Sequence, residues 1–123
     1  MEMDRCHFWL AKFRDREQID EYFREEYGDD DEPISQFAED QGVKFYDHDW
    51  VYVESSDKGD LDEILGNFRV PEATGKILLA FAEKLGFKSN ALIVADQREF
   101  ENPVSVEKDS YQLVYVGCHV LHG

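Results

Sequence analysis

The run Ala-Leu-Ile-Val-Ala at residues 91–95 constrains the fold most, because it is apolar at both odd and even positions. A strand with this pattern is covered on both faces or lies centrally in its sheet. Further runs, rich in aromatic or β-branched residues, at 6–13, 50–54 and 111–121 are typical of strands. The sequence therefore predicts a sheet of about four strands.

Four helices are expected between these strands. Apolar residues recur at helical spacing in four segments, and Asp15 and Asp60 each stand three residues before a capping-box partner. The predicted helices occupy residues 15–28, 33–42, 60–68 and 71–86. Gly28 is expected to end the first helix, and Pro33 to lie in the first turn of the second.

The resulting order, β-α-α-β-α-α-β-β, predicts an α+β fold with a mainly antiparallel sheet of about four strands. We expect about four helices packed on one face of this sheet, and the last two strands paired as a hairpin across the loop that contains Pro103. No linker-like segment divides the chain, so residues 1–123 are expected to form a single domain.

Alternation along the strands assigns residues to two faces of the sheet. The face expected to be core holds Cys6, Phe8, Leu10, Val51, Val53, Val114, Val116, Cys118 and Val120. The opposite face would hold His7, Trp9, Trp50, Tyr52, Tyr111, Leu113, Tyr115, Gly117 and His119. Aromatic side chains with polar tips suit a surface that a partner covers. The alternatives are a helix or loop packed over this face, or a homodimer through it.

Charge is distributed very unevenly along the chain. The 123 residues include 28 acidic and 13 basic side chains, a net charge of −15, but residues 1–66 alone carry −14. Such a chain cannot neutralise a run of phosphates, which argues against direct binding to nucleic acid. The content of 42% hydrophobic residues is that of a folded protein. The asymmetry predicts one strongly negative surface.

No stretch approaches the roughly 18 to 20 apolar residues of a membrane span, and the first residues lack a signal-peptide pattern. We therefore expect a cytoplasmic protein without membrane contact. In that compartment Cys6 and Cys118 are expected to be thiols rather than a disulfide. The dipeptides Cys6-His7 and Cys118-His119 point their side chains to opposite faces, so neither zinc nor another cofactor is expected.

The densest polar cluster is Tyr46-Asp47-His48-Asp49-Trp50. A carboxylate could orient His48 as a general base, but no serine, cysteine or threonine stands out as its nucleophile. We therefore expect no catalytic residues. A charged turn or a contact with a partner accounts for the cluster better.

Five short segments stand out for their order and spacing: His7-Phe8-Trp9-Leu10, Asp20-Glu21-Tyr22-Phe23, Ile34-Ser35-Gln36-Phe37, Asp40-Gln41-Gly42 and Phe45-Tyr46-Asp47-His48-Asp49. With these segments the chain resembles the immunity protein 22 family of bacterial toxin systems. The resemblance spans nearly the whole chain and is strongest over residues 7–50. It implies a cytoplasmic α+β antidote that binds a cognate toxin domain and has no catalysis of its own.

The partner-binding residues follow from charge and aromatic character rather than from the resemblance. A nuclease toxin has a basic cleft, which an acidic surface would both attract and fill. The residues expected to supply the negative electrostatic field are Asp29, Asp30, Asp31, Glu32, Asp47, Asp49, Glu54 and Asp57. The expected anchors are Tyr46, Trp50 and Tyr52. The alternative is an acidic nucleic-acid mimic that inhibits a DNA-binding protein outside any toxin system.

Overall fold

A central antiparallel sheet of five strands organises the computed structural model, which describes residues 5–27, 33–43, 46, 48–85 and 87–121. The strand order is β4-β5-β1-β7-β6. The strands are β1 (Arg5–Lys12), β4 (Val51–Ser55), β5 (Ala91–Asp96), β6 (Val106–Glu107) and β7 (Gln112–Val120). Every residue of β5 is buried, and β5 lies between β4 and β1, which confirms its expected central place. The α+β class is confirmed as well.

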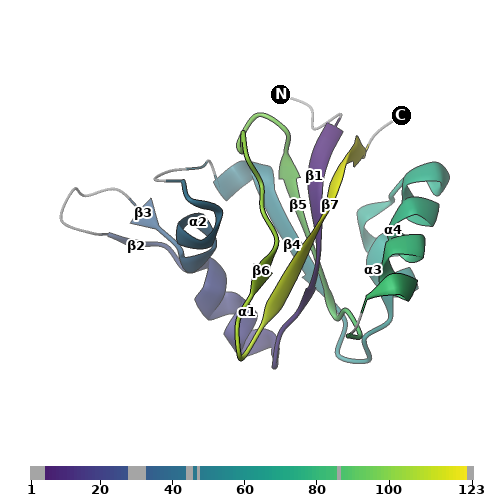
Figure 1. The fold of residues 1–123 in the computed structure, drawn as a ribbon, viewed down its shortest axis with the longest axis horizontal. Coiled ribbons are helices and arrows are strands. Elements are labelled where there is room, and N and C mark those ends of the chain that lie inside the picture. Colours follow the sequence, from purple (N-terminus) through teal and green to yellow (C-terminus); the bar gives the residue numbers. More distant parts are fainter. Residues whose placement is uncertain (1–4, 28–32, 44–45, 47, 86, 122–123) are drawn as a thin grey trace.

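The helices cover both faces of the sheet, which corrects the expectation that they share one face. Figure 1 shows α1 (Arg16–Phe23) and α2 (Gln36–Gln41) on one side, and α3 (Leu61–Phe68) and α4 (Glu72–Lys84) on the other. The physical reason lies in β1, where Trp9 faces one layer of helices and Phe8 faces the other, both fully buried. A strand that is apolar on both faces needs cover on both.

Two hydrophobic cores result, one on each side of the sheet. The Trp9 core lies under α1 and α2, and it includes Phe13, Ile19, Tyr22, Phe37, Ile93, Phe100 and Leu113. The Phe8 core lies under α3 and α4, and it includes Cys6, Leu10, Ile64, Leu78, Leu92, Val94 and Val116. Removing such side chains from water supplies the main favourable free energy of folding.

A β-bulge in β7 reverses the expected faces near the C-terminus. Trp9 pairs with Tyr115, but Phe8 pairs with Gly117, so Val116 is the extra residue. Gly117 has φ of +105°, a conformation that glycine adopts without strain. Beyond the bulge His119 lies beside Phe8, with ring centroids 6.0 Å apart, and Cys118 lies opposite His7. The predicted core positions of Cys118 and Val120 are therefore wrong, whereas Val116 is core as predicted.

Part of the expected aromatic face is a buried core in the structure: His7, Trp9 and Leu113 are buried, whereas Tyr52 is exposed on the other side of the sheet. Trp9 has no exposed surface, packs edge-on against Phe37 of α2 at 5.3 Å, and donates through Nε1 to the carbonyl of Val104. Trp50 packs against the opposite Phe8 core. Helices α1 and α2 cover the Trp9 side of the sheet, which is the alternative of a helix packed over this face, and nothing in the described residues supports a homodimer through it.

Val51 and Val53 also lie on the side opposite to the prediction. The register pairs Val53 with Ile93 and Tyr52 with Val94. Ile93 belongs to the Trp9 core, so the two valines pack there, and Tyr52 shares the side of Val94 in the Phe8 core.

The ends of the helices agree with the sequence at some positions and differ at others. The side chains of Asp15 and Asp60 cap α1 and α3 as predicted, and Gly42, with φ of +73°, ends α2. The first helix does not reach Gly28. Residues Glu26–Tyr27 (β2) instead pair with Pro33–Ile34 (β3) in a two-stranded ribbon, and Ser35 caps α2.

The predicted hairpin of the last two long strands is also wrong. β5 pairs with β4 and β1, whereas β7 pairs with β1 and with the short strand β6. β1 is inserted between them because its two apolar faces suit a central position. None of the helices in the described ranges has the length and hydropathy that a membrane crossing requires.

Candidate partner-binding surface

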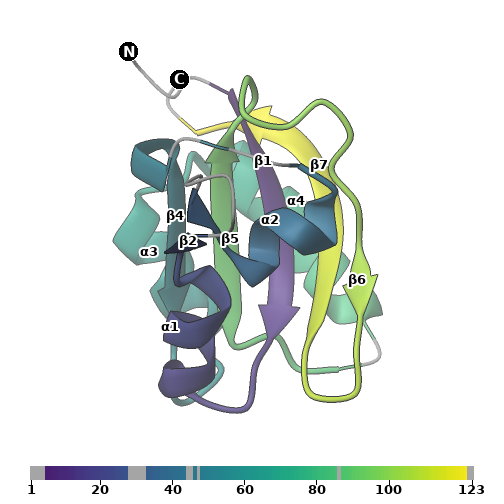
Figure 2. The same cartoon turned by 90° about the vertical axis from the view of Figure 1, so that its left-hand side faces the viewer.

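Strand β4 forms one edge of the sheet and has an open side. In Figure 2, where α1 and α2 face the viewer, β4 runs along one margin of the sheet with β5 beside it. Within the described residues β5 is the strand that pairs with β4 in this sheet. A short 3-10 turn, η1 (His48–Trp50), leads into β4. An edge strand presents a row of backbone groups that a further strand can bind.

The backbone groups of β4 divide into an inner and an outer set. The N–H of Ser56 donates to the carbonyl of Asn90 at 2.9 Å, which marks these two residues as a hydrogen-bonded pair. In an antiparallel ladder such pairs alternate with pairs that make no mutual hydrogen bond. Tyr52 and Glu54 therefore direct their N–H and C=O groups toward β5, and Val51 and Val53 direct theirs away from the sheet.

An apolar hollow adjoins this edge on the side of α1. Its volume is about 190 Å³, and its lining is Phe23, Tyr46, Val51 and Val53. Tyr46 is 6% exposed, and its Oη lies 3.0 Å from Ser35 Oγ. Burial raises the pKa of the Tyr46 phenol, so the wall it forms is neutral. The hollow can accept an apolar side chain next to β4.

Acidic side chains surround the same edge. Residues 48–63 hold six acidic residues against one basic residue, Lys58. Asp49 and Asp57 are exposed at the two ends of β4, and Glu54 is half-buried within it. Three more acids, at 60, 62 and 63, stand at the start of α3, where they also complement the positive end of the helix dipole. The field is therefore negative over this part of the molecule.

Arg16 connects α1 to the end of β4. Its Nη1 donates to Ser55 Oγ at 3.2 Å, and its Nε lies 3.3 Å from Asp20 Oδ1. The exposed acids Glu17 and Glu21 stand on the same helix. The acidic region thus continues from β4 onto α1, with Arg16 partly offsetting its charge.

Tyr52 is the most exposed of the large hydrophobic side chains in the described part of the chain, at 48%. It projects from β4 on the side opposite the hollow, because it alternates with Val51 and Val53. We name the combination the acidic edge, defined by Asp49, Val51, Tyr52, Val53, Glu54 and Asp57.

The predicted partner-binding residues are distributed as follows. Asp49, Trp50, Tyr52, Glu54 and Asp57 lie in β4 or next to it. Tyr46 lies in the Trp9 core and lines the hollow from inside. Asp29, Asp30, Asp31, Glu32 and Asp47 lie outside the described residues. Reasoning from the sequence missed Phe23, Val51 and Val53 as surface contributors, since their apolar character signals only burial.

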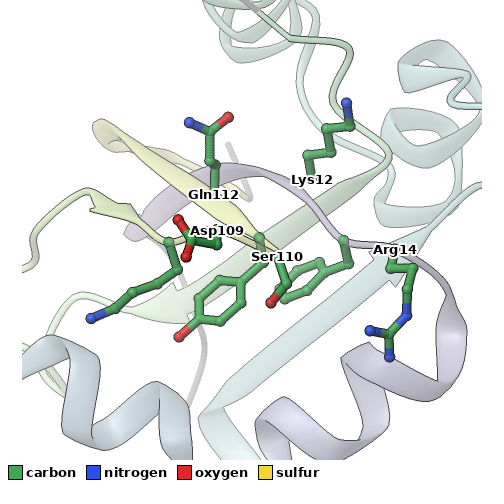
Figure 3. A pocket seen from close by; sticks show the side chains of 8 residues that line it. Lys12, Arg14, Asp109, Ser110 and Gln112 are labelled. Carbon is green, nitrogen blue, oxygen red and sulfur yellow. The ribbon is translucent and has the colours of Figure 1, made fainter.

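A second hollow, of about 300 Å³, lies where β1 ends and β7 begins (Figure 3). Its lining includes the cations Lys12, Arg14 and Lys108. In Figure 3 the side chains of Lys12 and Arg14 extend in different directions, and Arg14 lies 3.4 Å from Asp15. The cations do not converge on one point, so this hollow is a weaker candidate than the acidic edge.

The histidines and cysteines of the sheet have structural surroundings. His7 Nε2 lies 2.9 Å from the Phe100 carbonyl, which requires an N–H there, and Nδ1 then accepts from Tyr115 Oη at 2.8 Å. Cys6 and Cys118 form no disulfide within the described residues. The described residues contain no group of three side chains with metal-binding character.

A comparison with protein families identifies the family to which the chain belongs. The model described as Immunity protein 22 matches residues 6–121 of the 123-residue chain. The chain belongs to the immunity protein 22 family. Neither the curated proteins nor the solved structures provide a match. Membership in the immunity protein 22 family supports a role in toxin immunity, and that role implies binding to a toxin protein.

Proposed function

We propose that this immunity protein binds a cognate bacterial toxin domain through the acidic edge and thereby neutralises it. Family membership over residues 6–121 carries the immunity role. The open side of β4, its apolar hollow and the surrounding acids support the choice of surface. In this proposal the protein acts by binding alone, in the cytoplasm where the toxin would reach its target.

The charge of the acidic edge favours a basic partner. A toxin that cleaves nucleic acid has a positive cleft for phosphates, so we propose a nuclease domain as the partner class. Opposite charge would raise the association rate constant from about 10⁵ to 10⁶ M⁻¹s⁻¹ toward about 10⁸ M⁻¹s⁻¹ at low salt. Fast association suits an antidote, because free toxin is harmful from the moment it appears.

Titration calorimetry with the purified toxin domain encoded by the neighbouring gene tests the proposal. We expect a stable complex with the wild-type protein. The test variant reverses two charges of the acidic edge, Glu54→Lys with Asp57→Lys. The matched control, Glu72→Lys with Glu83→Lys, changes the net charge equally but on α4, which packs against β7.

The edge variant should lose about tenfold or more in affinity, and the α4 control should lose much less. Absence of any complex with the wild type would overturn the proposed function. Equal losses in the two variants would show that net charge matters and that the acidic edge is not the surface used.

A further inference from the structure

We propose that the toxin binds by adding an extended strand to the open side of β4, so that the five-stranded sheet continues into the partner. This inference rests on the proposed function and specifies how the acidic edge is used. The occupant it commits to is a segment of the toxin in which apolar residues alternate with Lys or Arg.

The backbone of β4 is prepared for such an addition. Val51 and Val53 direct their N–H and C=O groups outward, as the hydrogen bond between Ser56 and Asn90 requires. The N–H of Val51 can close the 3-10 turn η1 through the carbonyl of His48, because such turns are held by i→i+3 hydrogen bonds. The groups that face outward from the ladder and are open to a further strand are therefore the N–H and C=O of Val53 and the C=O of Val51. A strand placed at the usual spacing would satisfy them with main-chain hydrogen bonds, which give affinity independent of side-chain identity.

The sequence of β4 has few of the devices that protect exposed edges. Natural edge strands are commonly blunted by charged side chains, Pro, a bulge or very short length, and of these β4 has only the charge of Glu54. β4 reads Val-Tyr-Val-Glu-Ser, with β-favouring residues, neither Pro nor Lys, and continuous pairing with β5 over all five positions. The opposite edge, β6, has two residues and is blunted by its length.

Side chains around β4 specify the pattern of the added strand. Alternate residues of a strand face opposite sides of the sheet. On the side of the Trp9 core, they would meet the hollow lined by Phe23, Tyr46, Val51 and Val53. On the other side, they would meet Tyr52 and Glu54. Apolar side chains suit the first environment, and Lys or Arg suits the second through charge and contact with the Tyr52 ring.

Charge complementarity favours a basic strand, rather than a second copy of this chain, as the partner of the open side of β4. Residues 48–63 carry six acids and one base, so two copies of β4 side by side would bring like charges together. Like charges opposite each other destabilise a strand pair. A basic strand from another protein gains from the same arrangement.

Amide hydrogen exchange followed by NMR, on the wild-type protein with and without the toxin domain, tests the inference. In the free protein the amide of Val53 should exchange fast, while those of Tyr52 and Glu54, which bond to β5, are already protected. In the complex, exchange at Val53 should slow by about tenfold or more. The alternation distinguishes strand addition from simple shielding of the surface.

The outcomes separate the inference from the proposed function. A complex in which the amide of Val53 exchanges as fast as in the free protein would overturn strand addition and leave toxin binding intact. Failure to form any complex would overturn the proposed function, and the inference with it.

A pair of variants gives a second readout. Val53→Pro removes the outward N–H, and proline is tolerated on an edge strand where the N–H faces solvent. Val53→Thr keeps the N–H and the branched shape as the matched control. We expect Val53→Pro to speed dissociation of the toxin by about tenfold or more, with Val53→Thr close to wild type. Equal dissociation rates for the two folded variants would count against a main-chain contact, and the exchange experiment still decides if Val53→Pro does not fold.

Discussion

Tyr111 Oη donates a hydrogen bond to Asp40 Oδ2 at 2.6 Å, and so joins residues that are 71 positions apart in the chain. Tyr22 Oη donates to the same oxygen at 2.9 Å. The carboxylate of Asp40, in α2, thereby connects α1 to the segment that enters β7. This layer also supplies Phe23 and Tyr46 to the lining of the hollow beside β4, so its position shapes that hollow.

The first prediction concerns the stability that this carboxylate provides. Asp40→Ala leaves two phenols without their charged acceptor, and we expect a loss of about 2 to 3 kcal/mol in the free energy of unfolding. The exposed neighbour Glu39 is the matched control, and Glu39→Ala should change stability by less than about 0.5 kcal/mol. Urea denaturation measures both. Equal stability of the two variants would contradict this role for Asp40.

The second prediction is a loss of stability in alkaline solution. Burial, and then the charge and hydrogen bond of Asp40, raise the pKa of Tyr22 and Tyr111 in the folded protein. Above about pH 10 the unfolded chain releases phenolic protons that the folded protein keeps, so stability falls as pH rises. The contribution is fully present below this pH. Urea midpoints measured from below to above about pH 10 should fall less steeply with pH for Tyr111→Phe than for wild type. The same decrease with pH in both proteins would argue against a contribution of the Tyr111 phenol.

The third prediction compares two glycines. Gly117 has φ of +105°, and an added Cβ would lie 2.9 Å from His119 Nε2. Gly117→Ala should therefore cost about 1 to 3 kcal/mol. Gly66, in α3, has open space where its Cβ would be, so Gly66→Ala should gain about 0.5 to 1 kcal/mol. Thermal melts measure both variants, and a Gly117→Ala protein as stable as wild type would contradict the bulge.

The fourth prediction distinguishes residues that speed association with the toxin from residues that slow its dissociation. Replacing the three aspartates at 29–31 with lysine should slow association and weaken its dependence on salt, because the negative charges that attract a basic partner are removed. Tyr52→Ala should mainly speed dissociation, because it removes a large side chain from the contact. Stopped-flow and surface-binding kinetics with the toxin domain distinguish the two effects. Unchanged rates in both variants would place the interface elsewhere.

Much of the fold was predictable where a local pattern was strong. The double-sided apolar run 91–95 identified a central strand, and Asp15 and Asp60 marked helix starts because a cap depends on residues close in sequence. The two sides of β1 were not assigned correctly. The aromatic face that includes Trp9 could be covered by a partner protein or by a helix of the same chain, and only the tertiary placement of α1 and α2 shows that it is a helix.

The remaining errors have equally specific causes. The bulge at Val116 shifts the alternation of side chains between the two faces of the sheet by one residue. A single glycine in a strand, Gly117, does not show from sequence alone where such a shift occurs. Strands β2, β3 and β6 have two residues each, too few for any period to be visible. The extension of α1 to Gly28 failed because pairing with Pro33–Ile34 draws Tyr27 into β2.

The candidate site was predictable where it is continuous in sequence. Asp49, Tyr52, Glu54 and Asp57 fall in one stretch, so their acidic and aromatic character is visible without a structure. The hollow was not predictable, because Phe23 and Tyr46 come from segments that meet β4 only through the tertiary fold.

Growth rescue by co-expression directly tests whether this protein neutralises a toxin by binding it at the acidic edge. The toxin domain encoded by the neighbouring gene is expressed in cells with the wild-type protein, with Glu54→Lys/Asp57→Lys, or with the control Glu72→Lys/Glu83→Lys. The wild type and the control should restore growth, and the edge variant should not. Continued growth arrest with the wild type, or equal rescue by the edge variant, would contradict neutralisation through the acidic edge.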